Sequence, residues 1–183
     1  MSTATGAGTN TSTSTGLTVD DRFAIKDLLA QYAWALDMGD VDAFVDCFTP
    51  DGKRVEEVFE DPDVWEGAEG LRRLGQHYLT IPNFPGRQHY AANALMAGGE
   101  GKAQVKSYAL VTECQGEPPY QLRFCGYYED EVVLHEGRWR FAQRVVRLWD
   151  GAVLKRFPNR GDYVPRRRPP EFVLVNKPGI ANK

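Results

Sequence analysis

The hydrophobic pattern of this chain changes its period once, near residue 87, and this change limits the folds that are possible. Before it, apolar residues recur every three or four positions, as in amphipathic helices; after it, they alternate with polar residues, as in half-buried strands. Short turns join the successive alternating runs, which predicts an antiparallel meander. These runs cover residues 89–96, 103–112, 121–134 and 138–149. We therefore expect an α+β fold, with helices packed on one face of a curved antiparallel sheet.

The N-terminal half of the chain contains three predicted helices. The first begins after Thr18, a favourable N-cap that is followed by acidic residues, and it ends at Gly39. A short second helix begins at Asp40. Further along, the pattern predicts a turn at residues 49–52, a strand at 55–59 and the third helix at 66–79.

The two ends of the 183-residue chain differ in composition from its middle. Residues 1–17 are almost wholly small and polar and lack the basic start and apolar stretch of a signal peptide, so we expect a disordered tail. Residues 18–154 form the predicted domain. Residues 155–183 form a proline-rich arm, which is either a solvated tail or the source of a short strand at 172–175 on a neighbouring subunit.

Composition excludes several classes of function. The formal net charge of -3 gives no general reason to expect nucleic acid or an anionic membrane as a partner. No apolar run approaches the roughly 20 residues that span a bilayer. The three cysteines lack metal-ligand spacing and are expected to be reduced, mostly buried thiols of a cytoplasmic protein. The alternative is a bridge between Cys114 and Cys125 across neighbouring strands. Scattered histidines and the lack of a phosphate-binding loop predict no metal and no cofactor.

One acidic residue and one histidine are the main candidates for chemistry. Asp37 stands at the end of an apolar helix, where the helix dipole disfavours an acid, so it needs a compensating partner. His89 opens the first strand, and nothing near it in sequence requires an imidazole. If the fold brings them together, Asp37 orients His89 as a general base. The alternatives are a core histidine bonded to a backbone carbonyl and a solvent-facing aspartate.

Other residues could assist such a base. Tyr32 lies on the apolar side of its helix and could donate to a substrate oxygen or simply pack in the core. Arg144 and Arg147 fall on opposite faces of the last strand, so one of them faces inward and could stabilise a departing anion. A β-bulge could exchange the two faces. The alternative role for Arg144 is a surface arginine in an ion pair. The remaining substrate-binding candidates are Asn93, expected on the face of His89, with Trp34 and Tyr108.

Several motifs together resemble a known family. The motifs follow one another in a fixed order along the chain. They are residues 25–32, 36–40 around Asp37, 47–52, Arg87-Gln-His89, 107–108, 126–130, 137–141 and 144. Over roughly residues 18–150 this order is similar to the SnoaL-like branch of the nuclear-transport-factor-2-like superfamily. The resemblance implies a cone-shaped, cystatin-like α+β barrel with a deep pocket, and self-association as a dimer or trimer.

The resemblance also implies a range of activities. Members include polyketide cyclases, ketosteroid isomerase, several dehydratases, a dehydrochlorinase and small subunits of ring-hydroxylating dioxygenases. Asp37, His89 and Arg144 correspond to the dehydrochlorinase site and Tyr32 to a bile-acid dehydratase tyrosine, but that dehydratase's strand aspartate is missing here. We expect a cofactor-independent lyase, a dehydratase of a small apolar hydroxylated substrate such as a steroid, terpenoid or polyketide. The alternatives are an isomerase or cyclase with the same base and a non-catalytic dioxygenase subunit.

Overall fold

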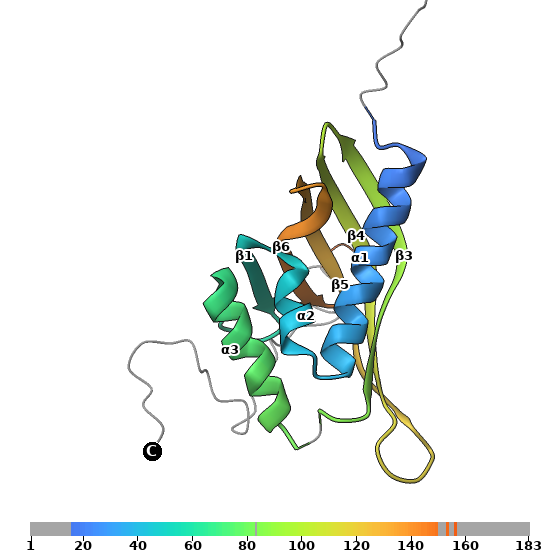
Figure 1. The fold of residues 1–183 in the computed structure, drawn as a ribbon. Helices are drawn as coiled ribbons and strands as arrows, with labels where there is room; N and C mark the ends of the chain where they lie inside the picture. The colour runs from blue at the N-terminus through green and yellow to red at the C-terminus, as the bar shows by residue number, and fades with distance from the viewer. Residues whose placement is uncertain (1–15, 83, 150–152, 154–155, 157–183) are drawn as a thin grey trace, which may run out of the picture.

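The computed structural model describes residues 16–82, 84–149, 153 and 156, and it confirms the predicted α+β fold. Helices α1 (Val19–Asp37), α2 (Val41–Asp46) and α3 (Gly67–Thr80) pack on one side of a curved six-stranded sheet (Figure 1). The sheet order is β2-β1-β6-β5-β4-β3, so β2 and β3 are its two edges. The strands are β1 (Phe48–Glu57), β2 (Asp63–Glu66), β3 (Arg87–Gly99), β4 (Lys102–Glu113), β5 (Gln121–His135) and β6 (Arg138–Leu148). Nearly all of the predicted N-terminal tail and C-terminal arm lies outside the described residues.

The topology differs from a simple antiparallel meander at β1. Strands β3 to β6 pair antiparallel in sequence order, as predicted, but β1 pairs in parallel with β6. The turn predicted at residues 49–52 lies inside β1, where the pairing with β6 shifts its register between Phe48 and Lys53. The Pro-Asp-Gly motif therefore produces an irregular strand rather than a chain reversal. Strand β2, which the sequence pattern did not predict, pairs with the second half of β1.

Helix α1 lies along the inner face of the sheet and is the longest helix described. It starts with a capping box, because the Asp21 amide donates to Thr18 Oγ1 at 3.1 Å while the Thr18 amide donates to Asp21 Oδ2 at 3.0 Å. Its buried side chains recur at helical spacing and are Ile25, Leu28, Leu29, Tyr32, Ala35 and Leu36. None of the helices in the described part of the chain combines the length and apolarity needed to cross a membrane.

A bulge in β3 decides which of its side chains face the helices. The register with β4 shifts between Ala92 and Leu95, and Asn93 adopts a positive φ of 52°. Ahead of the bulge, the side chain of His89 is largely buried; beyond it, Met96 packs against the core while Leu95 is exposed. The strict alternation expected from the sequence therefore fails within this strand.

A charged pair lies at the centre of the core. Arg144 on β6 donates through Nε and Nη2 to the two carboxylate oxygens of Asp130 on β5, both at 2.9 Å, and both side chains are 0% exposed. The guanidinium carbon also lies 4.0–4.3 Å from the ring centroids of Tyr32, Tyr128 and Phe141. A buried charge that loses its partner is strongly destabilising, so the fold depends on this pair being intact.

We predict that Asp130→Asn lowers the free energy of unfolding by about 3–5 kcal/mol, because it leaves the Arg144 charge buried without a counter-charge. Urea denaturation measures this change. The neighbouring Glu129 faces the other side of the sheet and pairs with Lys106 and Arg147 in partly exposed bridges. Glu129→Gln should therefore cost less than about 1 kcal/mol. Equal losses for the two variants would contradict the central role of the buried pair.

Candidate functional site

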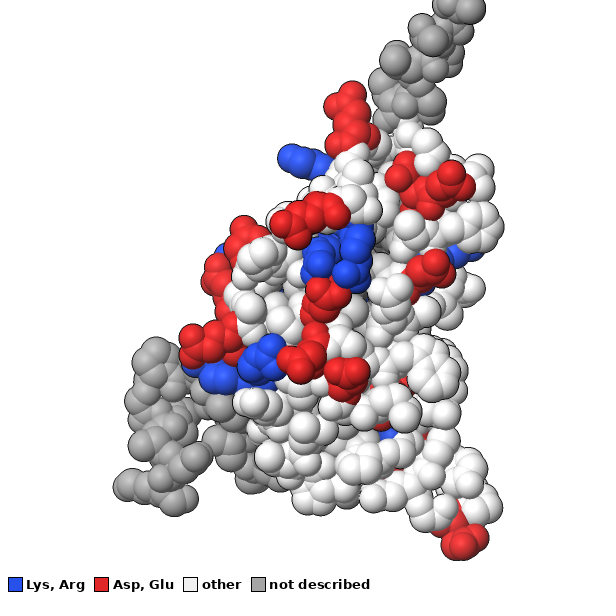
Figure 2. All heavy atoms as spheres, in the orientation of Figure 1, with Lys and Arg blue, Asp and Glu red and all other residues white. Residues whose placement is uncertain are grey.

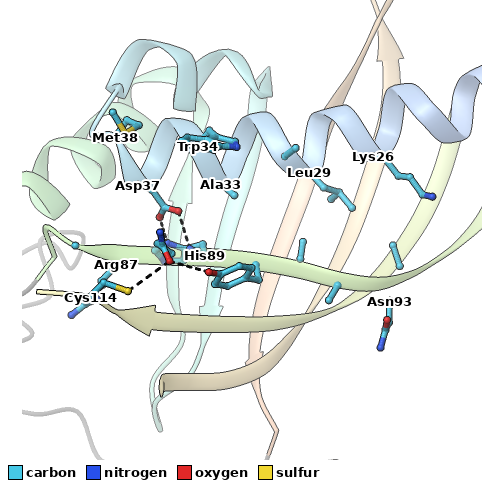
Figure 3. A pocket seen from close by; sticks show the side chains of 17 residues that line it. Lys26, Leu29, Ala33, Trp34, Asp37, Met38, Arg87, His89, Asn93 and Cys114 are labelled. Carbon is cyan, nitrogen blue, oxygen red and sulfur yellow. Dashed lines mark hydrogen bonds and ion pairs between the residues drawn. The ribbon is translucent and has the colours of Figure 1, made fainter. Parts of the chain in front are cut away.

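The carboxylate of Asp37 binds His89 twice and so joins the end of α1 to the start of β3. Asp37 Oδ1 lies 2.5 Å from His89 Nδ1, and Oδ2 accepts from the His89 backbone N–H at 2.9 Å. Figure 3 shows the Asp37 side chain pointing from the helix to the strand below it. Both side chains are largely buried, at 16% and 10% exposed. These two bonds fix the ring orientation and assign a proton to Nδ1, which leaves Nε2 available to accept another.

Local sequence explains how Asp37 reaches this position. Helix α1 ends at Asp37, and Gly39, with a φ of 70°, turns the chain away. An acid at this end opposes the helix dipole, and the donors from His89 compensate for that. Because the His89 amide bonds to Asp37, it lies on the free edge of β3 rather than on the side paired with β4.

The surroundings favour the neutral form of the imidazole. Burial lowers the pKa of His89 from its ordinary value; the hydrogen bond and charge of Asp37 oppose this, and the charges of Arg54 and Arg87 add to it. The ring also lies against Phe84, with 5.8 Å between ring centroids. At neutral pH, His89 is therefore uncharged, with Nδ1–H donated to Asp37 and an unprotonated Nε2. This is the protonation state that a general base needs.

A groove of about 1000 Å³ runs between α1 and β3, and the Asp37–His89 pair lies in it (Figure 3). Its volume falls in the range of small-molecule sites. Exposed Trp34 and Met38 line the same groove from α1. Short side chains line both walls and leave the space open: Ala30 and Ala33 from α1, and Ala91, Ala92 and Ala94 from β3. The groove can thus hold a mostly apolar molecule next to a base.

Charged side chains give the visible surface no extended field of one sign. Figure 2 shows acidic and basic groups interleaved over the upper and left parts of the face drawn, and few charges at its lower right. This face therefore offers no broad basic surface of the kind that attracts polyanions.

A second group of polar side chains is buried inside the fold, and most of its members are not predicted by the sequence pattern. Arg54 on β1 is 4% exposed, and its Nη1 donates to Tyr78 Oη on α3 at 2.9 Å and to Glu56. Nearby donors have no hydrogen-bond partner among the described residues, and a buried donor of this kind calls for an explanation. These atoms are Tyr32 Oη, Ser107 Oγ, Arg54 Nε and Arg144 Nη1.

The sequence carried only a weak signal for Arg54. It stands in Lys53-Arg54-Val55-Glu56, which has the charge pattern of a surface strand. The available sign was that Arg54 and Glu56 are two positions apart and so share a strand face. Because their strand was predicted to start only at residue 55, this pairing was not recognised.

The structure decides between the two candidate arginines. Arg144 faces the helices and lies against Tyr32, with 4.2 Å from its guanidinium carbon to the ring centroid. Arg147 lies on the opposite face, where it pairs with Glu57 and with Glu129. The substrate-binding assignment of Arg147 is therefore withdrawn, because it points away from the Asp37–His89 pair.

The facing of the strands bears on two further assignments. Asn93 lines the groove with His89, but the bulge in β3 turns its side chain away from α1 (Figure 3). Tyr108 lies on the outer face of β4, where its ring packs edge-on against Trp149 at 5.1 Å. Ser107, its neighbour, is the residue that faces inward. The cysteines are unpaired as predicted, but only one of the three is buried: Cys47 is buried, Cys114 is partly exposed and Cys125 is exposed.

Comparison with known sequences identifies the domain. A sequence profile described as the SnoaL-like domain matches residues 17–145, which is most of the described chain. No curated protein matches this chain.

Comparison with solved structures shows the same fold. A protein of unknown function with a cystatin-like fold from Nostoc punctiforme is 24% identical with a TM-score of 0.65, covering 74% of this chain and 96% of that one. A nuclear-transport-factor-2-like protein from Novosphingobium aromaticivorans is 20% identical with a TM-score of 0.64, covering 75% and 88%. A candidate scytalone dehydratase from the same organism is 22% identical with a TM-score of 0.61, covering 72% and 86%.

We predict that Asp37→Asn lowers the pKa of His89 further, because the carboxylate favours the imidazolium and burial opposes it. The ring signals of the three histidines can be followed by NMR as the pH is varied, and His89→Gln identifies the relevant signal. Asp40→Asn, which changes a helix N-cap on the other side of Gly39, is the matched control and should leave this pKa in place. A rise in the pKa on removing Asp37 would contradict the described pairing.

Proposed function

The chain belongs to the SnoaL-like family, and we propose that it is a cofactor-independent lyase that dehydrates a small, mostly apolar hydroxylated molecule. The observation that carries this proposal is the Asp37–His89 pair inside an alanine-lined groove. A neutral, oriented imidazole in a largely apolar site is suited to take a proton from carbon. Family membership alone does not select this reaction, because one fold can support many activities.

The proposed elimination uses His89 twice. Nε2 accepts the proton from a carbon next to the one that bears the hydroxyl group. The electron pair of the broken C–H bond forms the C=C bond, and the C–O bond breaks with its electrons going to oxygen. The departing hydroxide then takes the proton back from His89 and leaves as water. Asp37 stabilises the imidazolium that exists between the two transfers.

Tyr32 and Arg144, which lie in the buried core and not in the lining of the groove, are proposed to assist the departing oxygen from there. Burial raises the pKa of Tyr32, so its hydroxyl keeps a proton to donate, and it has no partner among the described residues. Arg144 lies against the ring of Tyr32; its charge is paired with Asp130, and its Nη1, which has no hydrogen-bond partner among the described residues, is the donor proposed to assist. Each such interaction typically contributes about 10²- to 10³-fold to a rate.

The groove suggests the class of substrate. Its alanine walls favour a compact apolar skeleton such as a steroid, terpenoid or polyketide, and Trp34 offers an aromatic surface at its side. An isomerase or cyclase could use the same base but would give a product of unchanged mass. A non-catalytic subunit would not need the Asp37–His89 pair.

We predict that His89→Ala reduces dehydration by at least about 10²- to 10⁴-fold while the thermal melting curve is kept. The assay incubates the protein with a panel of bicyclic β-hydroxy ketones and measures by mass spectrometry the loss of one water. His135→Ala changes a histidine at the β5–β6 hairpin and should retain activity. Dehydration by the His89 variant at the rate of the unaltered protein would refute the proposal, and a product of unchanged mass would point to isomerisation.

We also predict that Ala33→Phe weakens substrate binding, because the ring occupies the groove beside Asp37. The expected result is a rise in KM of about ten-fold or more, consistent with loss of roughly 1.4 kcal/mol of binding. The same substitution at Ala24, an exposed position of α1 that does not line the groove, serves as the control. If both variants raise KM equally, the substrate does not bind in this groove.

A further inference from the structure

Arg54 has no task in the elimination described above, yet it is buried close to the base. We propose that Arg54 is a positioning residue for His89: together with Glu56 and Tyr78, it holds the wall against which the imidazole lies and balances the charge of Asp37. This inference deepens the proposed function, because it concerns the same base, but it is testable without any substrate.

A continuous set of contacts leads from Arg54 to His89. The Arg54 guanidinium donates to the Tyr78 hydroxyl at 2.9 Å and to Glu56, which also accepts from that hydroxyl. The Tyr78 ring stacks on Phe84, with 4.6 Å between centroids and 15° between planes. Phe84 in turn lies against the ring of His89. Strand β1, helix α3 and the loop before β3 are thereby joined behind the base.

The burial of the Arg54–Glu56 ion pair argues against a purely stabilising role for Arg54. The side chains of Arg54 and Glu56 are 5% and 18% exposed, so both charges are largely removed from water. An apolar pair of similar volume would commonly fill such a place without loss of stability. In addition, Arg54 Nε has no partner among the described residues. Burying the Arg54 guanidinium costs desolvation free energy, so we explain its presence by the effect of its charge and its rigid contacts on His89.

The imidazole of His89 is influenced by charges of both signs. The described charged groups that influence the imidazole are Asp37 from α1, Arg54 from β1 and Arg87 from its own strand, while β4 places Val111 opposite. Tyr78 of α3 stays uncharged, since burial holds its pKa well above the usual range. Asp37 by itself would favour a protonated ring. Burial is the largest cause that opposes this, and the two arginines add to it, so the imidazole is oriented by a carboxylate while its pKa stays below the ordinary value.

Two variants that each remove one charge test the inference through the pKa of His89, measured by NMR on the full chain. Arg54→Gln should raise this pKa, because a positive charge that lowers it is removed. Glu56→Gln should lower it, because the charge of Arg54 is then no longer balanced. Arg54→Lys keeps the charge and should return the pKa toward that of the unaltered protein. Arg138→Gln, at an exposed arginine bound to Asp46, is the control and should change nothing.

The expected result is a rise of the His89 pKa in Arg54→Gln and a fall in Glu56→Gln. A merely structural role of Arg54 would not produce these opposite shifts. No shift in either Gln variant, or shifts in the same direction, would overturn the inference; if Arg54→Gln does not fold, the sign of the Glu56→Gln shift still decides. With a substrate, Arg54→Gln should also move the acid limb of the kcat/KM profile to higher pH. If His89 is not the base of the proposed dehydration, the His89→Ala variant keeps full activity. That outcome is independent of the pKa shifts.

Discussion

The double contact between Asp37 and His89 is the interaction on which the site depends. One carboxylate accepts from a ring nitrogen and from the backbone of the same residue, so the last turn of α1 and the edge strand β3 are held together at a single point. A largely buried acid at a helix C-terminus would be unfavourable without these donors. The same bonds that relieve this cost also orient the imidazole, so local stability and a possible base arise from one arrangement.

The interior of the domain contains two largely buried ion pairs. Arg144 with Asp130 and Arg54 with Glu56 place two guanidinium groups on neighbouring strands, at positions that are in register. Such pairs contribute little to stability once desolvation is counted. They do provide fixed charges in a medium of low dielectric constant, where charge that develops during a reaction is stabilised most strongly. The fold is shared by proteins of several functions, so the Asp37–His89 pair in its groove, rather than the architecture, is what suggests chemistry.

The sequence predicted secondary structure and buried faces correctly wherever they depend on a local pattern. The cap at Thr18, the buried stripe of α1 and the four alternating strands follow from spacing alone and are confirmed. Prediction failed where the chain departs from regular geometry. The Pro-Asp-Gly motif of β1 forms an irregular strand instead of a turn, and the bulge in β3 reverses the facing of Asn93. A single inserted position changes every later side chain of a strand to the other face, and no residue type announces it.

The amino-acid sequence by itself determined the class of fold and the identity of the residues able to act as acid, base or donor, because period and side-chain chemistry are properties of short segments. Only the tertiary structure decided which of them meet. Asp37 and His89 are 52 positions apart, and Arg54 reaches the base through residues of α3 and the following loop. Distances between side chains on different elements depend on how those elements pack and where strands bulge, and this information is distributed over the whole chain.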